Sequence, residues 1–267
     1  MPDAEIAAEF LVHDFFAWVY AFPLLGALVA DRLLGKYRTI LWLSILYCVG
    51  DLALAVFEDP SWQGAWFGKV YVDPLDGLWT GLFLIAVGSG GIKPCVSAHV
   101  GDQFGRANWG LLKKVYNAFY FIINFGSFFA SLFIPLIGGH QEVDPLTGHI
   151  GYSGSVAWAF GIPGILMGRA TIAFWSGRHR FLHIPPTLPP RVGLVDVLAG
   201  TSLFADLAYP IFFASSLWTL TNLIVLVVGL ALFVALFRLR QRLAPDDGFF
   251  AQVLHGVAST FGRTRAG

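Results

Sequence analysis

The chain has 267 residues, of which 56% are hydrophobic and 13% charged, and its 17 basic and 17 acidic residues leave no net charge. Soluble domains carry about 25% charged residues, so this composition excludes an ordinary water-soluble protein. The sequence also shows no P-loop, no nucleic-acid motif and no Cys/His metal spacing, and Cys48 and Cys95 give no disulfide framework. A polytopic α-helical membrane protein is expected.

Seven apolar runs are long enough to cross a bilayer as helices, which need about 20 residues each. They lie at approximately 8–30, 39–57, 78–100, 115–138, 155–176, 194–214 and 217–237. Basic residues gather in the first, third and fifth connections and in "RLRQR" after the last run. The second connection holds one lysine, and the fourth holds no lysine or arginine. Because Lys/Arg-rich loops stay in the cytoplasm, the odd connections and the C-terminus are predicted to lie inside.

The first run is then predicted to begin outside the cell. The first ten residues, "MPDAEIAAEF", have no basic region and are not typical of a secretory signal. An upstream helix that this chain lacks would explain this orientation, and a short translocated tail is the alternative. Within the run, His13 and Tyr20 are two helical turns apart and share a face, with Ala17 between them. His13 is either an interfacial residue or a cavity-facing imidazole that exchanges protons near neutral pH.

The end of the first run and the second run carry further charged residues. In "GALVADRLLGKYRTI", Asp31 is placed to cap or pair at the next helix, and Lys36 and Arg38 hold the loop inside; a purely topogenic basic loop is the alternative. Asp51, within the second run, is either a proton site or a residue paired to a neighbour.

The third run contains a residue that a membrane helix rarely carries. Lys93 stands directly before Pro94 and follows Gly88, Gly90 and Gly91. A lysine at a helix centre costs about 2.5–3.5 kcal/mol on insertion scales. Lys93 can snorkel if the helix ends near residue 100, and lies deeper if the helix continues through "SAHVGDQF". The glycines favour the deeper position, because they let helices pack closely beside the cation.

The fourth run carries a polar stripe on an otherwise apolar helix. Its members follow at spacings of 3, 4, 3 and 4, so they share one face: Asn117, Tyr120, Asn124, Ser127 and Ser131. Hydrogen bonding between helices would explain one or two such residues. Five in register indicate the lining of a solvated cavity.

Four segments together resemble the proton-dependent oligopeptide transporter family, a branch of the major facilitator superfamily. They are "GALVADRLLGKYRTI", "GSGGIKPCVSAHVGDQF", "FYFIINFGSF", and "GYSGSVAWAFGIPGILM" followed by "FWSGRHRFLHIPP". The resemblance covers about residues 8–190 and identifies the first run with the family's second helix. It implies an all-α N-terminal bundle over 1–192 without the family's first helix and its Glu-x-x-Glu-Arg motif. A transmembrane hairpin of the bacterial type, 193–242, and a cytoplasmic tail or next segment, 243–267, follow.

The resemblance also implies functional roles. Lys93 would face the central cavity and interact with a peptide carboxylate or with the glutamates of the missing first helix. Tyr20 and Asn124, with Tyr120 and Asn117, would contact the peptide. His13 and Lys93 would take part in proton coupling, and Asp31 and Arg38 would belong to a cytoplasmic gating loop.

These roles predict a proton-coupled symporter of di- and tripeptides in the inner (cytoplasmic) membrane, driven by the proton gradient without another cofactor or any nucleic acid. The chain would be part of a longer transporter, inactive alone, whose first helix and C-terminal bundle are its partners. Three alternatives stay open: a family member that moves nitrate or amino acids, a non-transporting interaction fragment, and a membrane-embedded enzyme using His13, Asp51 and Lys93. No paired carboxylates or activated nucleophile support the enzyme.

Overall fold

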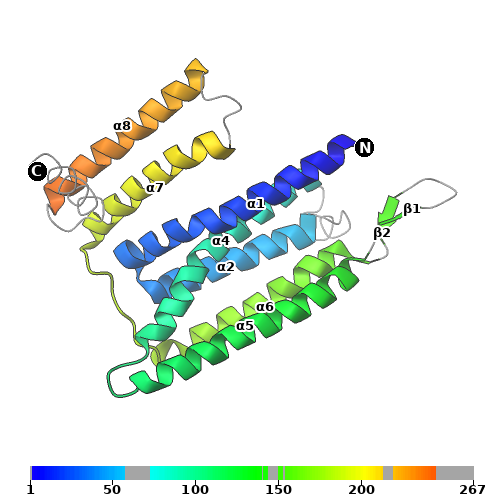
Figure 1. Ribbon diagram of the computed structural model, residues 1–267, viewed down its shortest axis with the longest axis horizontal. Helices are drawn as coiled ribbons and strands as arrows, with labels where there is room; N and C mark the ends of the chain where they lie inside the picture. Colours follow the sequence, from blue (N-terminus) through cyan, green and yellow to red (C-terminus); the bar gives the residue numbers. More distant parts are fainter. Residues whose placement is uncertain are drawn as a thin grey trace, which may run out of the picture. The chain divides into compact units, whose positions relative to one another are not determined.

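The computed structural model describes residues 2–57, 73–139, 141–143, 150–152, 154–212 and 219–244. Seven of its helices are long and apolar enough to cross a membrane, which confirms the seven predicted spans (Figure 1). The helices are α1 (Pro2–Val29) with its π-helical continuation η1 (Ala30–Leu34), α2 (Lys36–Phe57), α4 (Pro74–Asp102), α5 (Trp109–Gly138), α6 (Val156–Ser176), α7 (Pro190–Phe212) and α8 (Leu220–Leu243).

The remaining described elements are short. A 3-10 turn, η2 (Gly177–His179), follows α6. Strands β1 (Gln141–Val143) and β2 (Ile150–Tyr152) pair antiparallel between α5 and α6, in a connection that was predicted as a loop. Residues 58–72 of the predicted connection 58–76, residues 213–218 around the predicted connection between the sixth and seventh runs, and residues 245–267 of the predicted tail lie outside the described residues.

Helix boundaries follow from local sequence. Helices α4, α6 and α8 each begin after a polar capping residue: Asp73, Ser155 and Thr219. The side-chain oxygen of each capping residue accepts a hydrogen bond from a backbone N–H in the first turn of its helix. Gly35 ends η1 with φ 79° and Gly139 ends α5 with φ 72°, a backbone conformation that favours glycine. Polar caps and glycine stops therefore separate the apolar runs.

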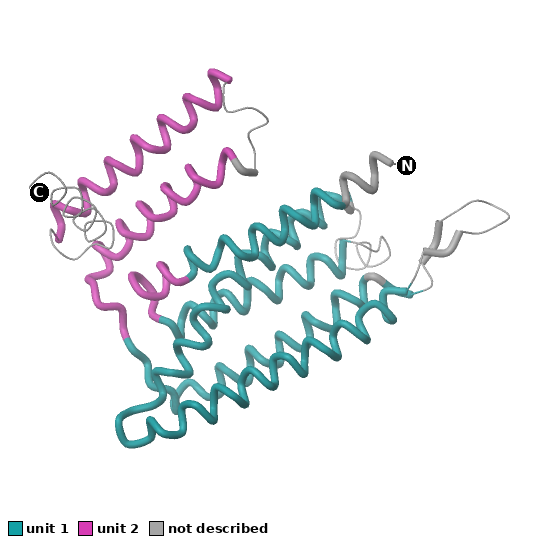
Figure 2. The backbone as a smooth tube through the Cα atoms, in the orientation of Figure 1, with its two compact units in different colours: residues 1–26, 36–184 teal, residues 27–35, 185–267 magenta. Residues whose placement is uncertain are grey.

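The chain forms two compact units (Figure 2). Unit 1 comprises residues 1–26 and 36–184, and unit 2 comprises residues 27–35 and 185–267. The predicted domain boundaries at 192 and 242 stay predictions.

In unit 1, α2 packs against both α4 and α6, and α5 lies beside α6 (Figure 1). Glycines bring these helices close: a Cβ on Gly50 would stand 2.9 Å from the carbonyl oxygen of Gly81, and one on Gly88 would stand 2.8 Å from the carbonyl oxygen of Leu43. Lipid is as apolar as the side chains, so close contact rather than hydrophobic burial holds membrane helices together. The described side chains of α5 are all at least partly exposed.

In unit 2, α7 and α8 form a hairpin, and α7 also packs against η1 (Figure 1). The carbonyl oxygen of Arg32 occupies the space that a Cβ on Gly193 would need. The last apolar run was predicted to end at residue 237, and α8 continues beyond it through "RLRQR" to Leu243. Arg240 lies in this continuation, is 1% exposed, and donates from Nε to Oδ1 of Asp196 at 2.8 Å. Removing either partner would leave the other charge buried and uncompensated.

Candidate functional site

Two predicted substrate-binding residues, Lys93 and Tyr20, come together in unit 1. The Nζ atom of Lys93, on α4, lies 5.4 Å from the ring centroid of Tyr20, on α1. Both side chains are exposed. A cation over an aromatic face at an exposed site gains about 0.5–1 kcal/mol. The ring therefore orients the ammonium group while leaving its three donors available to a ligand.

The depth of Lys93 follows from the length of α4. The helix continues through "SAHVGDQF" as far as Asp102, so Lys93 lies nine residues before the end of α4. At 1.5 Å per residue this places it about 14 Å from that end. This helix length is the condition under which the deeper position was predicted, and the depth of Lys93 in a bilayer stays a prediction.

Glycines form the packing surface beside this cation, as predicted. A Cβ on Gly26 would stand 2.3 Å from Cα of Gly91, and one on Gly90 would stand 2.4 Å from Cβ of Phe22. The Sγ atom of the buried Cys95 lies 3.9 Å from the carbonyl oxygen of Gly26. α1 and α4 thus cross backbone to backbone within one helical turn of Lys93.

His13 lies on α1 and is exposed. Its Nδ1 donates a hydrogen bond of 2.7 Å to the carbonyl oxygen of Glu9, one turn earlier in the same helix. The seven residues between His13 and Tyr20 correspond to about 10 Å along the helix axis. The structure therefore places the imidazole away from the pair formed by Lys93 and Tyr20, and its part in proton coupling stays a prediction.

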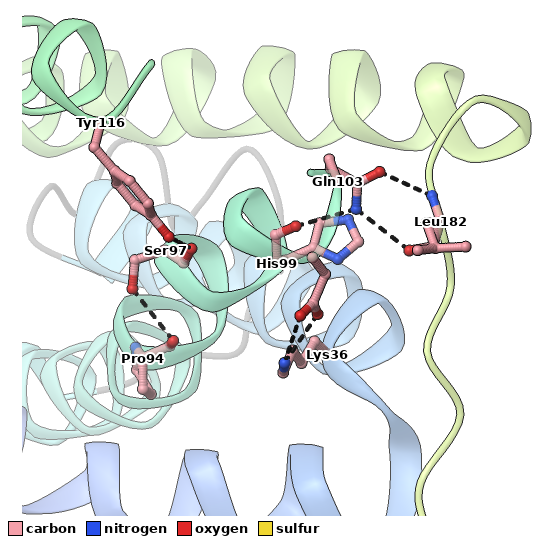
Figure 3. A network of polar contacts seen from close by, with 8 residues as sticks. Lys36, Pro94, Ser97, His99, Gln103, Tyr116 and Leu182 are labelled. Atoms are coloured by element: carbon pink, nitrogen blue, oxygen red, sulfur yellow. Dashed lines mark hydrogen bonds and ion pairs between the residues drawn. The ribbon is translucent and has the colours of Figure 1, made fainter. Parts of the chain in front are cut away.

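The predicted stripe on α5 is one exposed face. All five members are exposed: Asn117, Tyr120, Asn124, Ser127 and Ser131. Asn124 donates from Nδ2 to the carbonyl oxygen of Tyr120 at 2.8 Å, within its own helix. The link to another helix comes from a neighbouring residue, because the hydroxyl of Tyr116 donates to the carbonyl oxygen of Ser97 at 2.7 Å (Figure 3). That the stripe lines a solvated cavity stays a prediction.

The C-terminal end of α4 carries a polar network that sequence reasoning missed. Lys36 Nζ, at the start of α2, lies 2.9 and 3.1 Å from the two carboxylate oxygens of Asp102. The amide of Gln103 accepts from the backbone N–H of Leu182 at 2.8 Å and donates to the carbonyl oxygens of Leu182 and His99 at 3.3 and 3.0 Å (Figure 3). These bonds fix the segment after α6 to the end of α4.

Aromatic stacking reinforces this network. The ring of Tyr37 lies 4.2 Å from that of His183 and 5.0 Å from that of Phe174, and the ring of Phe181 lies 5.3 Å from that of Phe174. His99, buried on α4, lies edge-on to Phe174 and Phe181. The available sequence signal was that these residues belong to three of the segments resembling one family.

The two predicted gating-loop residues are exposed and belong to different units. Asp31 lies in η1, in unit 2, and Arg38 lies in the first turns of α2, in unit 1. Their neighbours form the ion pairs instead: Arg32 Nη1 lies 3.9 Å from Asp196 Oδ2, and Lys36 pairs with Asp102. Within the described residues, no group of three or more His, Cys, Asp or Glu could hold a metal ion.

A family model described as the POT family matches residues 37–222. The chain belongs to this family. It is 41% identical over 189 residues to the Drosophila melanogaster protein named peptide transporter family 1, covering 68% of this chain and 23% of that relative. It is 36% identical over 182 residues to solute carrier family 15 member 1 of Oryctolagus cuniculus, covering 66% and 25%.

Two solved POT structures share the fold. The POT family transporter PepTSo is 37% identical with a TM-score of 0.56, and the match covers 91% of this chain and 46% of that one. An auto-inhibited POT family peptide transporter is 38% identical with a TM-score of 0.58, covering 88% and 43%. The predicted all-α bundle of major facilitator type is confirmed. The chain spans about a quarter of the length of these curated relatives.

Proposed function

We propose that this multi-pass membrane protein takes part in proton-coupled symport of di- and tripeptides. The observation that carries the proposal is Lys93, held on an exposed surface of α4 by the ring of Tyr20 in a chain that belongs to the POT family. The Drosophila melanogaster relative and the auto-inhibited POT structure are named as peptide transporters. Lys93, Tyr20, Asn124, Tyr120 and Asn117 are the proposed peptide-binding residues.

Recognition would rest on the carboxylate that all short peptides share. A charge-assisted hydrogen bond contributes about 1.5–3 kcal/mol, more than the exposed cation–π contact of about 0.5–1 kcal/mol that a peptide would displace. Amide and hydroxyl groups of the α5 stripe would bind the peptide backbone. Varied side chains are then tolerated, because discrimination uses groups that every peptide carries.

Proton coupling requires that protonation change the balance between two conformations of the transporter. Lys93 and His13 are the proposed participants, with Asp31 and Arg38 at a gating loop and no cofactor other than the proton gradient. Basic odd connections favour the cytoplasmic membrane with the C-terminus inside. Because the chain spans a quarter of its relatives' length, we propose that transport also needs a first helix and a C-terminal bundle as partners.

Transport is favoured over catalysis by the arrangement of the three candidate enzyme residues. Lys93 contacts α1 on an exposed surface, whereas Asp51 is buried on α2 and His13 bonds to its own helix. They do not form one reacting constellation. A small anion such as nitrate is the second candidate ligand, because Lys93 would bind it by the same charge.

The test compares binding of a dipeptide and its C-terminal amide to the reconstituted chain, alone and with the remaining parts of a POT transporter. Lys93→Ala is expected to weaken dipeptide binding by about 10- to 150-fold, the equivalent of 1.5–3 kcal/mol. Lys93→Arg keeps the charge, and Lys113→Ala removes an exposed lysine from the second turn of α5 as a control. Equal binding of peptide and amide, or unchanged binding by Lys93→Ala, would contradict the proposal. Competition by nitrate identifies the second candidate.

A further inference from the structure

Asp51 is an acidic side chain buried within the bundle. It lies on α2, six residues before Phe57, which is about 9 Å from that end of the helix. Asp51 is only 3% exposed, and its Oδ2 atom has no hydrogen-bond partner within the described part of the chain. A Cβ on Gly164 of α6 would stand 2.8 Å from Cβ and 3.5 Å from Oδ2 of Asp51. The backbone of α6 therefore closes directly over the carboxyl group.

Among the residues that the structure describes, the groups that face Asp51 supply no cation. On α2 itself, Tyr47 and Cys48 lie one turn earlier. At this level α4 contributes Gly81 and Ile85, which contact Gly50. α6 contributes Gly164 and, farther along, Thr171, whose hydroxyl lies 4.0 Å from Sγ of Cys48.

Charged residues elsewhere on the packed helices are directed to other partners or to the surface. On α4, Lys93 faces Tyr20 and Asp102 pairs with Lys36, while Asp76 is exposed and His99 lies in the aromatic network. On α6, Arg169 is exposed. No described Lys, Arg or His forms an ion pair with Asp51, since the described ion pairs involve Asp102 and Asp196.

An ionised carboxylate in this position would lose its hydration and gain no counter-charge. Leaving a charge buried and uncompensated is strongly unfavourable, whereas a neutral carboxylic acid costs far less. A membrane adds to the penalty, because no bulk water reaches the helix interface from the lipid side. The packed arrangement of α2 and α6 therefore favours the acid form.

We propose that Asp51 is a proton-binding site whose occupancy is linked to the packing of α6 on α2. While the two helices are in contact, the carboxyl oxygen keeps its proton. When α6 separates from α2 and water enters, the O–H bond breaks, the proton passes to water and the carboxylate remains. Linkage is reciprocal, so deprotonation in turn favours separation. In this last step the inference rests on the proposed function, because the coupling is useful only in a proton-driven transporter.

The test is infrared spectroscopy of the full chain in lipid bilayers. A neutral carboxylic acid gives a carbonyl stretch that ionised carboxylates lack and that shifts in deuterated water. At neutral pH the wild-type chain should show this band, and Asp51→Asn should lose it. Asp76→Asn, a matched change at an exposed helix start, should keep it, and so should Asp206→Asn, which removes another aspartate within a membrane helix. A wild-type chain without the band, or an Asp51→Asn chain that retains it, overturns the proposal.

Two further samples keep the test independent of how well Asp51→Asn folds. With carboxyl-13C aspartate, the wild-type band should shift and the Asp51→Glu band should not. Gly164→Ala should force α6 away from the carboxyl, so its band should persist only at a lower pH; an unchanged titration would contradict the link to packing. These measurements involve no transport. If the chain shows the band but does not transport even with the remaining parts of a POT transporter, only the proposed function is contradicted. Proton-driven uptake without the band contradicts only this inference.

Discussion

The crossing of α1 and α4 beside Lys93 depends on an absent side chain, which Gly26→Ala would supply. The new Cβ would stand 2.3 Å from Cα and 2.8 Å from N of Gly91, and 2.9 Å from the carbonyl oxygen of Gly90. All three atoms are backbone, so no flexible side chain can turn aside. We expect this substitution to separate the two helices locally.

The size of the effect follows from these distances. Ordinary contact begins at 3.4 Å, so the backbones must move apart by about 1 Å, enough to lose a quarter to a half of the dispersion energy of the facing atoms. Overpacking of this kind typically costs about 1–3 kcal/mol. The equilibrium for opening the crossing should therefore rise about 5- to 140-fold.

Cys95 reports on this crossing directly, because it is buried with its thiol toward the carbonyl oxygen of Gly26. The chain has two cysteines, so Cys48→Ala leaves Cys95 as the one thiol. Under conditions where the helices reclose faster than a thiol reagent reacts, the labelling rate follows the opening equilibrium. In that background Gly26→Ala should accelerate alkylation of Cys95 by the same 5- to 140-fold.

The matched control is Gly126→Ala on α5, where a Cβ would meet nothing within 4 Å. It adds the same methyl group and the same increase in helix propensity without touching another helix. Labelling of Cys95 should stay at the rate of the Cys48→Ala parent. If Gly26→Ala labelled no faster than Gly126→Ala, the backbone-to-backbone crossing would be refuted.

Two further substitutions test the ends of the bundle and the hairpin. Gln103→Ala removes the side-chain amide that accepts from the N–H of Leu182 and donates to the carbonyl oxygen of Leu182. Trypsin should then cleave after Arg180 about 5- to 30-fold faster, the equivalent of 1–2 kcal/mol. An unchanged cleavage rate would show that these bonds do not hold the segment. Asp196→Asn leaves Arg240 buried without its counter-charge and should destabilise the detergent-solubilised chain by about 3–5 kcal/mol. Thermal unfolding should show a smaller loss of stability for the double variant Asp196→Leu with Arg240→Met. Equal unfolding temperatures for the wild type and Asp196→Asn would contradict the buried pair.

The helices were predictable because a bilayer restricts the backbone conformation of a segment that crosses it. Backbone groups in lipid must be satisfied internally, so each apolar run of sufficient length becomes a helix. The ends were less predictable, because they depend on partners far away in the sequence. α8 extends past its apolar run and includes Arg240, which forms an ion pair with Asp196. α5 begins at Trp109, six residues before the predicted start.

Within the candidate site, residues that share a helix face were predictable and contacts between helices were not. Periodicity placed the α5 stripe on one side, and the resemblance to a family brought Lys93 and Tyr20 into one site. Periodicity says nothing about which helix lies opposite. The bonds of Gln103 to Leu182 and of Tyr116 to Ser97 depend on distances set by glycine packing and by loop geometry, so sequence reasoning could not find them.

The contacts in unit 1 also indicate where it can change shape at the lowest cost. α1 and α4 pack closely at Gly26 and Gly91, where a Cβ on Gly26 would stand 2.3 Å from Cα of Gly91. α6 is held to the C-terminal end of α4 by Gln103, but near the other end of its contact with α2 it meets Asp51, a carboxyl whose Oδ2 makes no hydrogen bond within the described residues.

A separation of α6 from α2 would therefore hinge at the Gln103 end and open at the Asp51 end. Opening there costs no hydrogen bond at Oδ2 and gains the hydration of a carboxylate, which offsets part of the lost packing. At the Gln103 end the same movement would break the paired bonds to Leu182 and the stacking of Tyr37 on His183. The end of α6 that is held by Gln103 is therefore expected to stay in place, and the end expected to move is the one that covers the proposed proton site.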